Sequence, residues 1–218
     1  MFITDNKNPS SALIKAVHQF YPVGFNMPNI QYEGFSQLQE ILTIKNNNVS
    51  QNTIPENLKK LEERLRSHFG LLPIYIEYYK QFPSYSIVIE LFNRQHEGVQ
   101  HIQRLAIKVS LLINYYTIYY EDYIKYNGLM YELGPVNTTV ASFQLQNEKT
   151  ELKNINAVEH YLQECFPEYF YVKHDLLFNL KIHHGTLIDE ELELASEIKT
   201  VFSFLFDNQF YASLLVVE

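Results

Sequence analysis

The sequence is organised around RLAIKVSLLINYYTIYYEDYIKYNGLMYEL, residues Arg104–Leu133, a run rich in aromatic and β-branched side chains. Asn127-Gly128 lies between apolar flanks, and such a pair favours a type I′ turn because both residues readily take positive φ. We therefore predict a β-hairpin made of Tyr115–Tyr126 and Leu129–Leu133. Leu105–Ile113 alternates apolar and polar residues, which predicts a further strand ahead of this hairpin.

Other segments also show the period of two that is typical of strands. The alternation shifts phase around Asn114, which predicts a bulge or a break between two strands. Gly134-Pro135 is predicted to turn the chain. Further strands are expected at Ser84–Phe92, Thr139–Leu145, Glu168–Lys173, Thr200–Phe206 and Phe210–Val217, the last two as a terminal hairpin.

Helical periodicity is concentrated near the N-terminus. The strongest helix signal is in Ile54–Gly70, which has Pro55 in its first turn, an apolar leucine stripe and Gly70 at its end. Lys45–Thr53 is polar and rich in Asn, and is predicted to be an exposed loop. Other helices are predicted between the cap residues Asn8–Ser11 and Tyr21-Pro22, at Ser36–Ile44 and at Ile155–Phe166.

The order of these elements is helices, a run of strands, one helix and strands again. This order lacks the regular strand–helix alternation of a parallel α/β sheet. We predict an α+β fold with a largely antiparallel β-sheet of meander and hairpins. Its helices are expected to pack on one face and to be concentrated in the first 70 residues. Residues 1–218 are expected to form a single α+β domain, and a weak boundary near 70–84 is the alternative.

The composition is that of an ordinary globular protein, with 46% hydrophobic and 19% charged residues. The formal charge is −8, from 17 basic and 25 acidic side chains, so binding to a nucleic-acid phosphate backbone is not expected. Cys165 is the only cysteine, which excludes an intramolecular disulfide and fits a reducing compartment. The N-terminus lacks a secretory pattern, and no run reaches the roughly 18–20 apolar residues of a membrane span. We expect a cytoplasmic protein that does not bind a membrane.

The sequence contains none of the common catalytic or phosphate-binding motifs. His96-Glu97 begins like a zinc-binding H-E-x-x-H motif, but His101 comes one position too late to share a helical face with His96. Cys165 and His160 lie about 140° apart on their predicted helix and do not face each other. We therefore assign no catalytic residue, metal or cofactor.

The densest group of histidines defines an alternative function, an enzyme with a metal or His/Asp site. This group consists of His174, Asp175, His183 and His184. Imidazoles and a carboxylate can bind a transition metal, or act as a base with its orienting partner. Neighbouring residues of a strand point to opposite faces, so at most one of His183 and His184 would face such a site.

The leading prediction is a non-enzymatic protein-binding module with an acidic, Tyr-rich sheet surface. Its candidate residues are Tyr119, Tyr120, Glu121, Asp122, Tyr123 and Tyr126, near the tip of the predicted hairpin. Tyrosine is favoured in protein interfaces, and the carboxylates would complement a basic partner protein. Small acidic α+β proteins without catalytic motifs include bacterial immunity proteins, which neutralise a toxin by masking its active site, and the composition is compatible with that role. A third hypothesis, a subunit of a larger assembly, predicts a broad exposed apolar patch.

Overall fold

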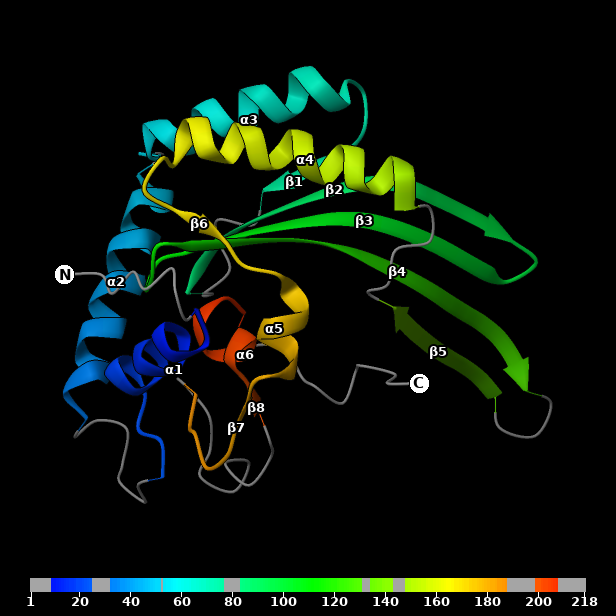
Figure 1. The fold of residues 1–218 in the computed structure, drawn as a ribbon. Helices are drawn as coiled ribbons and strands as arrows, with labels where there is room; N and C mark the ends of the chain where they lie inside the picture. Colours follow the sequence, from blue (N-terminus) through cyan, green and yellow to red (C-terminus); the bar gives the residue numbers. More distant parts are fainter. Residues whose placement is uncertain are drawn as a thin grey trace.

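The computed structural model describes residues 9–24, 32–51, 53–76, 83–130, 134–142, 148–187 and 199–207. Its centre is an antiparallel meander in which each strand pairs with its neighbour in the chain (Figure 1). The strands of the meander are β1 (Ile74–Ile76), β2 (Ser84–His96), β3 (Val99–Ser110), β4 (Tyr115–Met130) and β5 (Gly134–Ser142). A short strand, β6 (Phe170–Tyr171), runs parallel to the start of β4. The predicted α+β class and the largely antiparallel sheet are confirmed.

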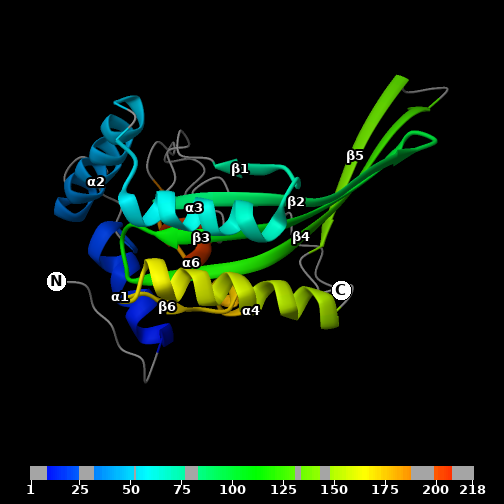
Figure 2. The ribbon, with the colours of Figure 1, turned by 90° about the horizontal axis from the view of Figure 1, so that it is seen from above.

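One face of the sheet is covered by α3 (Glu56–Phe69) and α4 (Glu148–Cys165), and we call it the α3/α4 face (Figure 2). In α3 the fully buried residues Leu58, Leu61 and Leu65 are three and four positions apart, which places them on one side of the helix. They belong to a core that includes the strand residues Ile87, Ile89, Leu105, Ile107, Tyr116, Ile118 and Tyr120. The predicted helix Ile54–Gly70 is therefore confirmed, apart from two residues at its start and Gly70 at its end.

The opposite face is covered by α5 (His174–Asn179) and α6 (Val201–Leu205), and we call it the α5/α6 face. Behind them pack α1 (Pro9–Phe20) and α2 (Glu33–Ser50). These helices share a second core with the sheet residues Ala106, Tyr115 and Tyr119. The structure therefore adds a second helical layer to the one that the sequence predicted. Two short strands, β7 (Lys181–Ile182) and β8 (Lys199–Thr200), form a separate antiparallel pair.

The predicted hairpin turn at Asn127-Gly128 is wrong. Asn127 pairs with Asn137 and Gly128 pairs with Val136, so both residues lie inside a continuous strand. Pairing with β5 runs from Asp122 to Met130 of β4, beyond Tyr126 where the pairing with β3 ends, and this ladder outweighs the local turn preference of two residues. The connection to β5 falls at residues 131–133, outside the described residues. Gly134-Pro135 opens β5 and does not form the predicted turn.

Two further predictions are corrected by tertiary contacts. Lys45–Ser50, predicted as part of a loop, continues α2, and the Lys45 ammonium is buried and donates to the Ser84 carbonyl at 2.8 Å. Val201–Leu205, predicted as a strand, is α6, and all five of its residues are buried. A short apolar run buried on every side has no periodicity that distinguishes a strand from a helix. Its predicted hairpin partner, Phe210–Val217, lies outside the described residues.

Two other predicted strands end earlier in the structure than in the prediction. β3 ends at Ser110, and residues 111–114 connect it to β4, so the break predicted around Asn114 is confirmed. Of the strand predicted at Glu168–Lys173, only Phe170–Tyr171 is paired. In the described residues no helix is both long and apolar enough to span a membrane.

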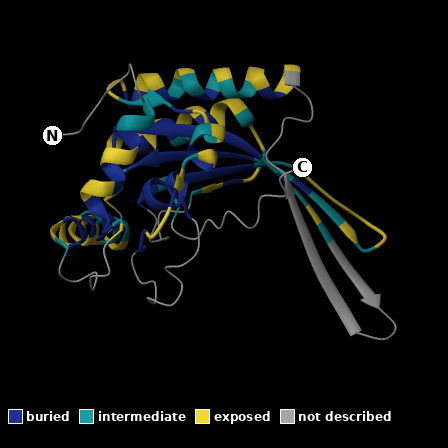
Figure 3. Cartoon of the chain, turned by 60° about the horizontal axis from the view of Figure 1, so that its bottom comes forward, coloured by how far each residue is buried: buried dark blue, intermediate teal, exposed yellow. Residues whose placement is uncertain are grey.

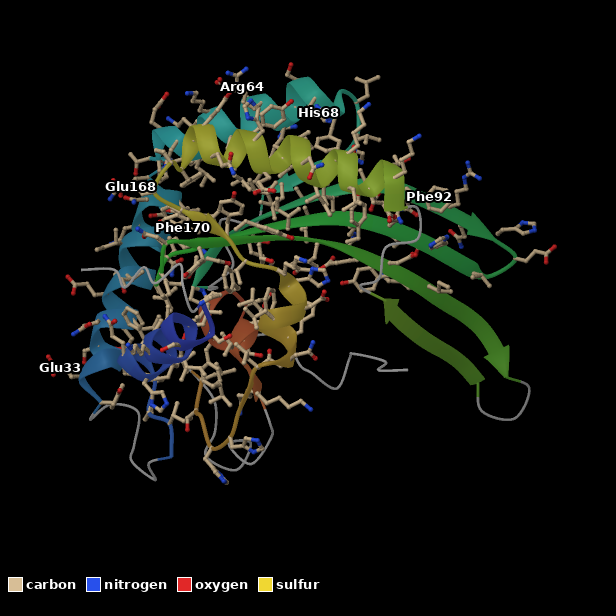
Figure 4. All side chains as sticks on the ribbon, viewed as in Figure 1. Glu33, Arg64, His68, Phe92, Glu168 and Phe170 are labelled. Atoms are coloured by element: carbon tan, nitrogen blue, oxygen red, sulfur yellow. The ribbon has the colours of Figure 1, made fainter. Side chains whose placement is uncertain are left out.

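The sheet continues beyond its helical layers as a projecting arm (Figures 2 and 3). We define the arm as residues 92–103 of the β2–β3 hairpin, residues 122–130 of β4, and β5. The helical cover on the α3/α4 face ends at the first turns of α4, where Gln103 Nε2 donates to Glu151 Oε1 at 2.9 Å. Figure 4 labels Phe92 at the point where the sheet emerges beyond α4. The arm therefore presents sheet surface that α3 and α4 do not cover.

Candidate functional site

The six residues of the predicted binding surface do not form one surface. Tyr119 and Tyr120 are 2% and 1% exposed, and they point into the two different cores because neighbouring strand residues face opposite sides of the sheet. The Tyr120 hydroxyl accepts from Asn154 Nδ2 at 3.1 Å, and burial raises its pKa to about 12. These two tyrosines contribute to packing and not to an exposed patch.

The remaining predicted residues are divided between the two faces at the base of the arm. Asp122 is buried on the α3/α4 face and accepts a hydrogen bond from His101 Nε2. Glu121 and Tyr123 alternate with it and lie partly buried on the α5/α6 face. Tyr126 pairs in register with Val99, further out along the arm. Five of the six predicted side chains are therefore buried or partly buried, and none of these five lies at a hairpin tip.

A buried ion pair occupies the centre of the α5/α6 face. Lys108 of β3 lies between Ile107 and Val109, which belong to the core under α3 and α4, so its side chain points to the opposite, α5/α6 face. Lys108 Nζ lies 2.9 Å from Asp207 Oδ2, and the two side chains are 4% and 15% exposed. Asp207 lies two residues after the end of α6, so this pair joins that end of the helix to the middle of the sheet.

The last carbonyls of α6 are satisfied by side chains, because a short helix leaves most of its carbonyl groups without an intrahelical partner. Three hydroxyl groups, one from Tyr21 just after α1 and two from serines of the sheet, supply these hydrogen bonds. Tyr21 Oη donates to the Phe204 carbonyl at 2.7 Å, Ser110 Oγ to the Leu205 carbonyl at 2.9 Å and Ser84 Oγ to the Phe206 carbonyl at 2.6 Å. Together with the ion pair, these bonds fix α6 against the sheet.

Glu121 extends this polar cluster toward the arm. Burial raises the pKa of its carboxyl group, and the charges of Lys108 and Arg104 together with a hydrogen bond from Tyr123 oppose that effect only in part. Asp207 raises the pKa further. The Arg104 guanidinium lies 5.6 Å from the centre of the Tyr123 ring and 3.8 Å from Glu90 Oε2. The cluster thus contains cations, carboxylates and tyrosines in a largely buried position.

The raised pKa of Glu121 predicts a dependence of stability on pH. A carboxyl group whose pKa is higher in the folded protein than in the unfolded chain favours folding at low pH, and this contribution is lost as the pH rises through the two pKa values. We therefore expect Glu121→Gln, which removes the charge but keeps the shape, to raise the free energy of unfolding at pH 7. The difference from wild type should shrink as the pH falls below the ordinary range of a glutamate.

Urea unfolding of both proteins between pH 3 and pH 8 measures this effect, with Glu63→Gln on the exposed side of α3 as the matched control. A lower stability of Glu121→Gln at pH 7 would show that the contacts of the carboxylate with Lys108 and Arg104 outweigh the cost of its burial.

The histidine group of the alternative prediction is divided between two environments. His174 Nε2 lies 3.1 Å from Asp175 Oδ1, and its ring packs against Tyr119 and Phe178. His183 and His184 are exposed after β7, and their ring centres are 6.5 Å apart. Within the described residues no three His, Cys, Asp or Glu side chains come together in a way that could hold a metal ion. The structure therefore pairs His174 with Asp175 and places His183 and His184 elsewhere, exposed after β7.

The other residues weighed for chemistry have different surroundings in the fold. Cys165, the last residue of α4, is buried in the core, and burial raises the pKa of its thiol. His160 Nε2 lies 3.2 Å from Glu164 Oε1 on the same helix, and His96 is exposed at the end of β2. His101 differs from these residues, because its partner, Asp122, comes from the neighbouring strand.

The α3/α4 face of the arm carries exposed apolar side chains beside an arginine and a histidine. Val99 and Ile124 are 36% and 47% exposed, and the register places them as diagonal neighbours on this face. The Arg94 guanidinium lies 4.8 Å from the centre of the Phe92 ring, and the His101 ring lies 5.0 Å from it on the other strand. We call these five residues the arm patch. Sequence reasoning missed it, because no strand was predicted over residues 93–104, which contain three of its five residues.

Comparisons with protein-family models, with curated proteins and with solved structures found no match.

Proposed function

We propose that this protein is a non-enzymatic protein-binding module and that the arm is its contact surface. The observation that carries the proposal is the exposure of Val99 and Ile124 next to each other on a sheet face that continues beyond the helices. Apolar, aromatic and arginine side chains are the types enriched at protein interfaces. The arm patch contains all three types.

The arm patch is held in place before a partner arrives. Asp122 is buried and fixes the His101 ring, and Gln100 Nε2 donates to Asn93 Oδ1 at 2.9 Å across β2 and β3. Gln103 is anchored to Glu151 of α4. Side chains that are already ordered lose less conformational entropy on binding, which favours affinity. A sheet surface with an apolar centre and a His101 ring already fixed by Asp122 is therefore a suitable platform for a partner protein.

The charge of the chain favours a basic partner. The formal charge of −8 attracts a basic protein over long range and accelerates encounter. The short-range contacts at the arm patch then determine how long the complex lasts. Neutralisation of a toxin by masking its active site, as immunity proteins do, is the form of this function that we propose.

Charge substitution in the arm patch tests the proposed function. Val99→Lys and Ile124→Lys, separately and together, should weaken capture of the native partner from an extract of the host by at least about tenfold, because each places an ammonium in the desolvated centre of the interface. Ile44→Lys on α2 is a matched control, since Ile44 is 53% exposed and lies away from the arm. It should capture the partner as wild type does.

Circular dichroism and the unfolding midpoint show whether the variants retain the fold. Asp122→Lys is unsuitable for this purpose, because it would bury an ammonium group in place of the carboxylate that contacts the His101 ring. Equal capture by wild type and by the folded double variant would overturn the assignment of the arm as the contact surface. Loss of capture by Ile44→Lys alone would place the contact at α2 instead.

A further inference from the structure

We propose that two copies of this chain associate through the edge of β5 that faces away from β4, with the two β5 strands antiparallel about a two-fold axis at Thr138. The two meanders would then form one continuous sheet. This proposal concerns a different part of the arm from the arm patch and does not depend on the proposed function.

The edge of β5 is a template for strand pairing. Within the described residues its strand neighbour is β4, with which it pairs from Asp122↔Ser142 to Met130↔Gly134. Its other edge therefore carries a row of backbone N–H and C=O groups over a strand of nine residues. Such an edge pairs readily with another strand unless the protein protects it.

The sequence of β5 lacks the features that usually prevent an edge strand from pairing with another chain. The strand reads GPVNTTVAS, which contains no charged residue and only one proline, Pro135, near its start. The opposite side of the arm is different, because the outer edge of β2 reads NRQH over residues 93–96 and follows a register irregularity between Glu90 and Phe92. Charges and bulges are the devices that keep edge strands apart. Of the two long edges of the arm, the edge of β5 is the one that lacks them.

The strand is also complementary to itself. A two-fold interface requires that each residue meet its mirror partner on the other copy. Antiparallel pairing centred on Thr138 places Val136 opposite Val140 twice and Asn137 opposite Thr139 twice, with Thr138 opposite its own copy. Cross-strand pairs of β-branched residues and of threonines stabilise sheets. The absence of charge from β5 also means that the net charge of −8 on each chain is not concentrated at this contact.

Sedimentation equilibrium of the full chain over a hundredfold range of concentration tests the proposal. We expect a reversible monomer–dimer equilibrium for wild type. Thr138→Lys places two ammonium groups opposite each other at the axis and should raise the dimer dissociation constant by at least about tenfold. Gln95→Lys adds the same charge to the outer edge of β2 and should leave the constant unchanged.

A cysteine at the axis gives a second test, which does not depend on the stability of the lysine variant. Directly opposed residues of antiparallel strands have Cα atoms roughly 4.5–5.5 Å apart, within the range of a disulfide. Thr138→Cys in a Cys165→Ser background should therefore form a covalent dimer under mild oxidation, and Gln95→Cys should not. A monomeric mass for wild type at every concentration would overturn the proposal, and so would a dimer that Thr138→Lys does not weaken.

Discussion

Lys108→Met is expected to lower the free energy of unfolding by about 3–5 kcal/mol, because removal of one partner from a buried ion pair leaves the other charge without compensation. Lys108 is 4% exposed and its ammonium lies 2.9 Å from the carboxylate of Asp207. The loss would affect more than one anion, since Lys108 also opposes the raised pKa of Glu121. Chemical denaturation at pH 7 measures the change.

A double variant separates the ion pair from simple packing. Lys108→Met with Asp207→Asn removes both charges and should recover a large part of the loss, since the remaining groups no longer include an unpaired carboxylate at the end of α6. Lys59→Met on the exposed side of α3 is the matched control and should change stability by less than about 0.5 kcal/mol. A loss below about 1 kcal/mol for Lys108→Met would contradict the role that we assign to the pair.

Gly34→Ala is expected to destabilise the protein by about 2–3 kcal/mol. A Cβ atom at Gly34 would lie 1.9 Å from the carbonyl oxygen of Gln19, which is backbone and cannot move aside as a flexible side chain could. Alanine in place of glycine within a helix normally stabilises by about 1 kcal/mol. Here the forced separation of α1 and α2 should outweigh that gain, because overpacking at a backbone contact costs about 1–3 kcal/mol or more.

Thermal and chemical unfolding of Gly34→Ala and of Ser36→Ala distinguish the clash from helix propensity. Ser36 is exposed in the same helix, so its replacement by alanine should be neutral or slightly stabilising. An increase in stability for Gly34→Ala would mean that α1 and α2 do not approach each other as closely as the structure shows.

The elements that the sequence predicted well have a clear period and matching end signals. Leu58, Leu61 and Leu65 repeat at helical spacing and Gly70 follows with a φ of 61°, so α3 could be located from residue types alone. The first part of β2 could be found in the same way from its alternation. The antiparallel class then followed from the order of the elements.

The errors arose where distant contacts override local preference. Asn127-Gly128 has a strong turn signal, yet pairing with β5 extends β4 through these two residues, beyond Tyr126 where the pairing with β3 ends. Lys45 and its asparagine-rich surroundings resemble a loop, yet they continue α2. The buried Lys45 ammonium donates a hydrogen bond to the carbonyl of Ser84, a residue far along the chain. No local pattern contains these partners.

The candidate site was predictable only in part. Strand alternation already implies that Tyr119 and Tyr120 face opposite sides, so the buried position of at least one could have been inferred from the sequence. The pairing of Lys108 with Asp207 could not, because the two residues are 99 positions apart and meet only when α6 docks on the sheet. The arm was also unpredictable, since it depends on where the helices stop along the strands.

Hydrogen–deuterium exchange of the protein, free and bound to the partner that it captures, tests most directly whether the arm is the contact surface. We predict that partner binding slows exchange mainly in residues 92–103 and 122–126, and that exchange in α1, α2 and α3 stays as in the free protein. Slower exchange in those helices, with no change along the arm, would contradict the proposed function.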